Sequence, residues 1–161
     1  MGGARYFVIF IDDHTRFTWI YLMTHRSELP NIYISFTHMI RTQFSKTIKV
    51  LYADNAMEYK ASSLLLFLHQ EGTIPQYSCP GTSQQNGRVE RKHKHILDIV
   101  RTLLIFVQCP ERFWGEIAFT VVYTINRHPT PLLHHKSPYE SLYGMSPTYD
   151  LLKVWGCACF V

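Results

Sequence analysis

The stretch LYADNAMEY, residues 51–59, places Asp54 at the end of a mainly apolar run that begins at Ile48. Asn55 follows directly, so the carboxylate is predicted to lie where a strand stops and a polar loop begins. In α/β sheets, binding and catalytic sites are built at the carboxyl ends of strands. The stretch therefore predicts an α/β domain with a functional group at Asp54.

A second acidic residue, Glu90, lies in TSQQNGRVERKHK, residues 82–94, and 35 residues separate it from Asp54. Apolar residues recur around it at intervals of three and four, which is typical of an amphipathic helix. Glu90 is therefore predicted in the first or second helical turn. A carboxylate at a helix start and one at a strand end can share a cation, and hard oxygen ligands on an open site favour Mg²⁺ or Mn²⁺.

Local patterns predict the other elements. The apolar run 6–11 and the segment 17–23 are expected to form a hairpin across the turn 12–16. Ser27 is a candidate cap for the helix that follows. Further helices are predicted from Ser62 or Ser63 to His69, from Pro110 onward and over 138–143, with strands at 48–52, 73–77 and 154–161.

Several blocks of the chain, in order and in spacing, resemble the integrase catalytic core of copia-type long-terminal-repeat retrotransposons, a retroviral-like family. Together they cover roughly residues 2 to 161. Two departures are Ala56-Met57, where the family has two glycines, and Ser83, where it has proline; the first is predicted to stiffen or shift the loop after Asp54. The blocks are YFVIFIDDHTRFTWIYLM (6–23), LYADNAMEY (51–59), GTSQQNGRVERKHKHILDIVRTLL (81–104), ERFWGEIAFTVVYTINRHPT (111–130) and SPYESLYGMSPTYDLLKVWGCACFV (137–161).

The resemblance implies a ribonuclease H-like α/β fold, a mixed sheet flanked by helices with strand order 3-2-1-4-5. The chain begins at Met1, within the family's connection between the first two strands. We therefore expect it to lack the first, central strand and the first catalytic Asp that this strand carries. Residues 1–145 would form the truncated core, and residues 146–161 a connector and the first strand of a following small β-barrel domain. Asp12 and Asp13 match a turn in the family and do not replace the absent Asp.

The activity implied by the resemblance is metal-dependent DNA strand transfer, the chemistry of DNA integration. Two Mg²⁺ or Mn²⁺ ions are expected in the intact family site, with the first Asp bridging both and Asp54 and Glu90 each completing one. Without the bridge, Asp54 and Glu90 would hold one ion weakly, so the isolated chain is predicted to be inactive. Its unpaired strand edges also predict marginal stability or aggregation.

Basic residues surround Glu90 and predict contact with DNA. Helix geometry places Arg91, Lys94 and Arg101 along one side, with Glu90 at its border, where a phosphate backbone could run. The resemblance implies that Asn86 and Lys94 contact the viral-type DNA end. The candidate DNA-binding residues are thus Asn86, Arg91, Lys92 and Lys94.

Simpler explanations exist for the same residues. Glu90 and Lys94 are four positions apart, which suits an exposed helical ion pair worth a few tenths of a kcal/mol. Asp54 could close a turn with Asn55, and the basic residues could form a solvated helix face. The interval between the two carboxylates and the matching blocks favour metal-ligand positions over both local explanations.

Composition fits one compact domain of a nuclear or cytoplasmic protein. With 161 residues, 47% of them hydrophobic and 17% charged, the chain has enough apolar material for a core and too little charge for disorder. The net charge of +4 permits a polyanionic partner without requiring one. No membrane span or secretory signal is evident in the sequence. DNA and other integrase subunits are the partners that the resemblance implies.

Two further functional classes stay open. The chain could be a non-catalytic DNA-binding or integrase-assembly module, or a translated, non-functional remnant. A ribonuclease H-like nuclease is disfavoured, because the blocks around Trp114 and residues 138–144 resemble integrases.

Overall fold

The computed structural model describes residues 3–78, 87–150 and 152–153. Strands β1 (Tyr6–Ile11) and β2 (Thr18–Met23) form an antiparallel hairpin with Val8 opposite Tyr21. Strands β3 (Val50–Ala53) and β4 (Ile74–Tyr77) form a parallel pair. Among the described residues the two pairs are separate two-stranded sheets.

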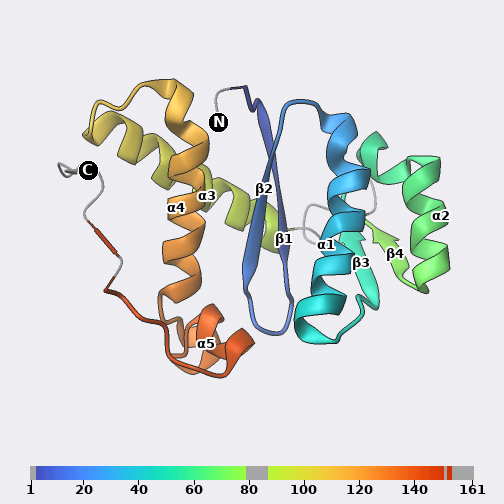
Figure 1. Ribbon diagram of the computed structural model, residues 1–161. Coiled ribbons are helices and arrows are strands. Elements are labelled where there is room, and N and C mark those ends of the chain that lie inside the picture. Colours follow the sequence, from blue (N-terminus) through green and yellow to red (C-terminus); the bar gives the residue numbers. More distant parts are fainter. Residues whose placement is uncertain (1–2, 79–86, 151, 154–161) are drawn as a thin grey trace.

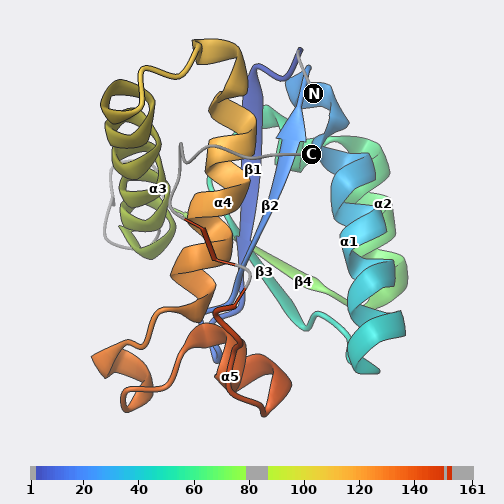
Figure 2. The same cartoon turned by 60° about the vertical axis from the view of Figure 1, so that its left-hand side comes forward.

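Helices cover both faces of these strands. Figures 1 and 2 show α1 and α2 on one side, α3 and α4 on the other, and α5 at one end. In the described part of the chain the α-helices are α1 (Leu29–Phe44), α2 (Ser62–Glu71), α3 (Gly87–Phe106), α4 (Trp114–Arg127) and α5 (Pro138–Tyr143). Short 3-10 turns are η1 (Arg26–Glu28), η2 (Met57–Lys60), η3 (Glu111–Phe113) and η4 (Pro131–Leu133).

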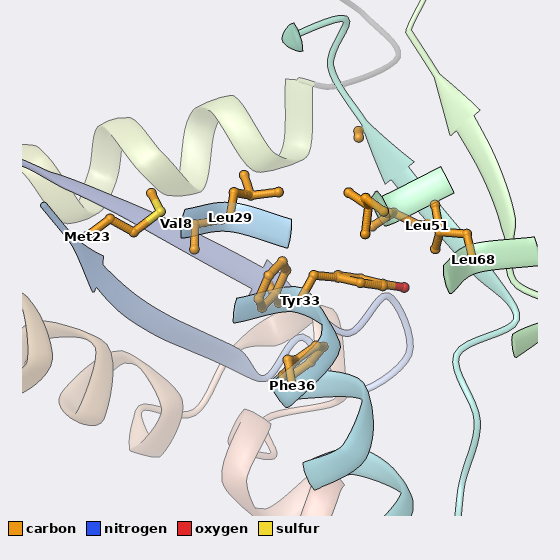
Figure 3. Close-up of a cluster of buried hydrophobic side chains, with 10 residues drawn as sticks. Val8, Met23, Leu29, Tyr33, Phe36, Leu51 and Leu68 are labelled. Carbon is orange, nitrogen blue, oxygen red and sulfur yellow. The ribbon is translucent and has the colours of Figure 1, made fainter. Parts of the chain in front are cut away.

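Two hydrophobic cores form because successive side chains of β1 point to opposite faces. Val8 and Phe10 belong to the cluster beneath α1 and α2, whereas Ile9 packs with the apolar faces of α3 and α4. The first cluster also contains Leu51 from β3, so it spans both sheets. Figure 3 shows Tyr33 of α1 reaching from the β1 side toward Leu51 and Leu68. Side-chain packing under α1 therefore joins two sheets that share no backbone ladder in the described chain.

The inner edges of β1 and β3 lack a strand partner among the described residues, since β1 pairs with β2 alone and β3 with β4 alone. This arrangement agrees with the expected sheet without its central strand. Open edges expose backbone donors and acceptors that favour association with another strand.

Most predicted elements are confirmed, with shifted boundaries. The strand expected at 48–52 runs over Val50–Ala53, so Asp54 follows it directly. Ser27 lies within η1 and is not the cap of α1, whose N-cap residue is Glu28, without a side-chain cap hydrogen bond. The Glu28 carboxylate instead closes the start of η1, where it accepts hydrogen bonds from the backbone N–H groups of Thr24 (3.0 Å) and His25 (2.6 Å). A carboxylate in the first turn satisfies donors that have no partner within the helix. The strand predicted at 154–161 lies outside the described residues.

Asn126 of α4 joins that helix to the outer edge of the hairpin. Its side chain is 3% exposed. Its Oδ1 accepts from the Thr18 N–H at 2.9 Å and its Nδ2 donates to the Thr18 carbonyl at 2.8 Å. One amide side chain thus occupies the place that a neighbouring strand's backbone would take.

No helix in the described part of the chain is long and apolar enough to span a membrane.

Tyr33→Phe is expected to leave stability unchanged or to raise it by about 1 kcal/mol, because its buried hydroxyl has no hydrogen-bond partner among the described residues. Burial raises the pKa of Tyr33, and the side chains of Thr37 and Thr73 act to lower it. Both threonine hydroxyls donate to backbone carbonyls, of Tyr33 at 3.0 Å and of Ile48 at 2.8 Å, so neither donates to the phenol. Tyr77→Phe is the matched control, since the Tyr77 hydroxyl donates to the Tyr59 carbonyl at 3.1 Å. Urea unfolding should show a loss of about 1 kcal/mol for the control alone. An equal loss of unfolding free energy for Tyr33→Phe would contradict the conclusion that the Tyr33 hydroxyl has no hydrogen-bond partner.

Candidate functional site

A cleft of about 420 Å³ lies between β1 and the loop that follows β3. Residues from β1, η1 and the start of α1, η2 and the first turns of α3 form its walls. It therefore opens beside the unpaired inner edge of β1. The lining residues are Arg5, Tyr6, Phe7, Val8, Ile9, Met23, Arg26, Leu29, Asp54, Ala56, Glu58, Tyr59, Val89 and His93.

Asp54 lines this cleft at the carboxyl end of β3, as the sequence predicted. Its carboxylate is exposed, and Oδ1 accepts a hydrogen bond from the Ala56 N–H at 3.1 Å. The local turn is thus closed with Ala56 rather than Asn55. The Asn55 side chain donates instead to the Ser78 carbonyl, just beyond β4. These bonds fix the loop while Oδ2 of Asp54 keeps no hydrogen-bond partner within the described residues.

The loop after Asp54 accommodates the two non-glycine residues noted in the sequence. Ala56 has φ −60° and ψ 142°, and Met57 opens η2. Neither residue adopts the left-handed backbone that favours glycine. The chain therefore continues from Asp54 into a short 3-10 turn that contributes Glu58 and Tyr59 to the cleft.

Charged and phenolic groups set the electrostatics near Asp54. The Glu58 carboxylate lies 3.9 Å from the Arg26 guanidinium. Burial, followed by the charges of Asp54 and Glu58, raises the pKa of Tyr59 to about 12. Tyr59 consequently stays a neutral phenol at physiological pH and cannot compete as an anionic ligand.

Glu90 lies in the first turn of α3 and is exposed, in agreement with the predicted helix start. The residues around it, Val89 and His93, line the same cleft as Asp54. The His93 ring stacks on Phe7 of β1 at 4.3 Å between centroids and 8° between planes. This contact holds the first turns of α3 against β1, and burial lowers the pKa of His93. Glu90 and Lys94, both described, form no ion pair with each other.

The predicted DNA-binding residues separate onto different surfaces. Arg91 and Lys94 are exposed on α3, whereas Lys92 is half-buried. Burial, followed by the charge of Arg16, lowers the pKa of Lys92. Asn86 lies outside the described residues. The structure thus brings together Asp54 and the helical turn of Glu90, and separates Lys92 from Arg91 and Lys94.

Sequence reasoning missed a charged cluster at the turn between β1 and β2. Oδ1 of Asp13 lies 2.6 Å from Nη1 of both Arg16 and Arg88. Although burial acts to raise the pKa of Asp13, the hydrogen bonds and charges of Arg88 and Arg16 hold it below its usual value. The only local signal was the spacing of Arg88 and Lys92, which are i and i+4 on one helix face.

The described residues contain no group of three or more His, Cys, Asp or Glu side chains that could hold a metal ion. Asp54 and Glu90 remain as exposed carboxylates contributed by a strand end and a helix start. Their oxygen atoms are hard donors of the kind that Mg²⁺ and Mn²⁺ prefer. The donor chemistry fits such an ion, and tight binding would need a further ligand from outside the described residues.

Sequence comparison relates the chain to transposon polyproteins. The profile of the family described as Integrase core domain matches residues 1–83. The retrovirus-related Pol polyprotein from transposon RE1 of Arabidopsis thaliana is 41% identical over 156 residues, which are 97% of this chain and 10% of that protein. The corresponding polyprotein from transposon TNT 1-94 of Nicotiana tabacum is 33% identical over 160 residues, or 99% of this chain and 12% of that protein. The chain therefore spans about a tenth of the length of these relatives.

Structural comparison finds the same fold at low sequence identity. The HTLV-2 integrase catalytic core domain, solved in complex with magnesium in a trimeric form, superposes with a TM-score of 0.62 at 13% identity. The match covers 83% of this chain and 82% of that one. The predicted ribonuclease H-like fold and the resemblance to copia-type integrases are thus confirmed. The chain belongs to the integrase core domain family.

Proposed function

We propose that this chain is the part of a retrotransposon integrase core that supplies Asp54 and Glu90 to a metal-dependent site for DNA strand transfer. The cleft is the main support for this proposal, because it is lined by Asp54 and by Val89 and His93, the α3 residues on either side of Glu90. Phosphoryl transfer by this route depends mainly on positioning and charge stabilisation, and exposed carboxylates at the rim of a cleft can provide both.

Asp54 and Glu90 would hold Mg²⁺ or Mn²⁺ through their carboxylate oxygens, with two ions in the complete site. The bound ions supply Lewis-acid stabilisation of charge on the reacting phosphoryl oxygens. Asp54 is oriented for this role by the Ala56 N–H. The Asn55 bond to Ser78 keeps its loop attached to β4. Tyr59 remains protonated beside the site and therefore adds no negative charge.

The third carboxylate is proposed to arrive on a strand that fills the space between β1 and β3. Three observations support this: both inner edges are unpaired, the cleft opens at the β1 edge, and helices cover both faces. A strand placed there would satisfy the open backbone groups of β1 and β3. It would come from the longer polypeptide of which such a core is part.

DNA and further integrase subunits are the proposed partners. Arg91 and Lys94 are exposed on α3, one and four positions after Glu90, so phosphates near the carboxylates would meet positive charge. Asn86 is proposed as a contact to the DNA end. The trimeric form of the structural relative suggests self-association for this chain as well.

Strand-transfer assays test the proposal directly. An integrase polypeptide containing this chain is expected to join a 3′-hydroxyl DNA end to target DNA in Mg²⁺ or Mn²⁺, and failure with both ions would contradict the function. The isolated 161-residue chain is expected to show no joining. Joining by the isolated chain that disappears in Glu90→Gln would show that two carboxylates suffice.

A non-catalytic DNA-binding module is the second candidate, favoured by the absence of a third potential ligand near the pair within the described residues. It predicts salt-dependent DNA binding that Lys94→Ala weakens, without any metal-dependent joining by the longer polypeptide. A non-functional remnant predicts neither property.

A further inference from the structure

We propose that Arg16, Arg88 and Lys92 form a clamp for a backbone phosphate of DNA, at the junction of the β1–β2 turn with α3. This inference rests on the proposed DNA-binding function and extends the DNA surface beyond the exposed residues of α3. The clamp takes its members from two segments that are far apart in sequence, since Asp13 and Arg88 are separated by 75 positions.

The first argument is the local balance of charge. Arg16 and Arg88 meet at the carboxylate of Asp13, whose Oδ1 is 2.6 Å from both guanidinium groups. Lys92 lies one helical turn after Arg88 on α3 and makes no ion pair with any described carboxylate. Burial, followed by the charge of Arg16, lowers the pKa of Lys92. With the Asp12 carboxylate of the same turn counted as well, the three cations exceed the two carboxylates by one positive charge. A phosphate would neutralise charge that Asp13 leaves uncompensated.

The second argument is that the backbone fixes the cluster before any ligand binds. Asp12 closes the turn by accepting hydrogen bonds from the Thr15 N–H at 2.8 Å and the Thr15 hydroxyl at 2.7 Å. Arg16 then adopts φ +61°, a left-handed conformation that a long side chain rarely takes. Such strain persists only where the surrounding structure imposes it, and it is common at binding sites.

The third argument is access. The side chain of Arg88 is 64% exposed and that of Arg16 is 30% exposed, so both guanidinium groups are reachable from solvent. Arg88 and Lys92 are one helical turn apart on α3, and Glu90 lies between them in sequence. A DNA strand held by the clamp would therefore pass the first turns of α3, which carry Glu90.

Fluorescence anisotropy with a labelled duplex oligonucleotide of about 20 base pairs tests the clamp on an integrase polypeptide that contains this chain. Arg16→Asn, which tolerates the left-handed backbone, and Lys92→Gln are each expected to weaken binding roughly fivefold near 0.1 M salt and to reduce the salt slope by about one. Asp13→Asn is expected to strengthen binding by a similar factor. Lys46→Gln, an exposed lysine beyond α1, removes the same charge and should change affinity less than twofold.

The outcomes separate this inference from the proposed function. Lys94→Ala could weaken DNA binding while Arg16→Asn and Lys92→Gln change the affinity no more than Lys46→Gln does. In that case the clamp is wrong, and the proposed DNA contact by the exposed residues of α3 is retained. If Asp13→Asn also fails to strengthen binding, the charge argument fails with it. Absence of any salt-dependent DNA binding by the folded polypeptide would contradict both the clamp and the proposed DNA surface.

Discussion

Asp54→Asn is expected to lower the rate of DNA strand transfer about 100-fold or more in an integrase polypeptide that contains this chain. The substitution keeps the shape and the hydrogen bond that Oδ1 accepts from Ala56, but removes the charge that would hold a divalent ion. Loss of metal-based charge stabilisation amounts to several kcal/mol, and each 1.36 kcal/mol corresponds to about tenfold in rate. Single-turnover joining of a labelled 3′-hydroxyl end measures the effect.

Glu58→Gln is the matched control for this experiment. Glu58 lines the same cleft as Asp54, and its carboxylate faces Arg26 at 3.9 Å. Joining should change less than about threefold, because Glu58 is not proposed as a metal ligand and its ion pair is long, with an exposed Arg26. If Glu58→Gln abolished joining and Asp54→Asn did not, the ligand would be misassigned within the cleft. Circular dichroism of both variants should match the parent, since both positions lie outside the hydrophobic cores.

Asn126→Ala is expected to lower the free energy of unfolding by about 3 kcal/mol. It removes both partners of the Thr18 backbone, whose N–H and carbonyl groups are then buried without hydrogen bonds. Each such buried group contributes about 1 to 3 kcal/mol of destabilisation. Urea unfolding followed by far-UV circular dichroism measures the change, and in a marginally stable chain the cooperative transition itself should disappear at 25 °C.

Thr124→Ala provides a control on the same helix. The exposed Thr124 hydroxyl donates only to the Thr120 carbonyl at 2.9 Å, a group already bonded within α4. Its removal should change stability by less than about 0.5 kcal/mol. Equal effects at Thr124 and Asn126 would mean that α4 tolerates loss of the contact to β2, and the docking role assigned to Asn126 would be wrong.

Elements governed by local patterns were predictable from the sequence. The strand Tyr6–Ile11 and the helix Pro138–Tyr143 lie within the predicted bounds, because an unbroken apolar run and a serine followed by proline are local signals. The positions of Asp54 after a strand and Glu90 in the first helical turn were predictable for the same reason.

Contacts between distant segments were not predictable in this way. The Asn126 bond to Thr18 spans 108 positions, and neither residue carries a periodic signal that indicates the other. Likewise, the helical pattern around Lys92 predicts which residues share a helix face with it. It does not predict that Arg16, in the turn between β1 and β2, affects the pKa of Lys92. Ser27 was a reasonable cap by composition, yet a 3-10 turn precedes α1 and includes Ser27, so the helix starts after Glu28.

The division of the strands into two pairs beneath one shared core also determines how backbone amides should exchange with deuterium. Every second amide of β1 points toward β2 and is bonded there, whereas the others face the open inner edge. Alternating protection along β1 would therefore report whether the space beside it is empty, and uniform protection would report a strand in place. Amide exchange along β1 would thus show, residue by residue, whether a central strand is paired with the hairpin.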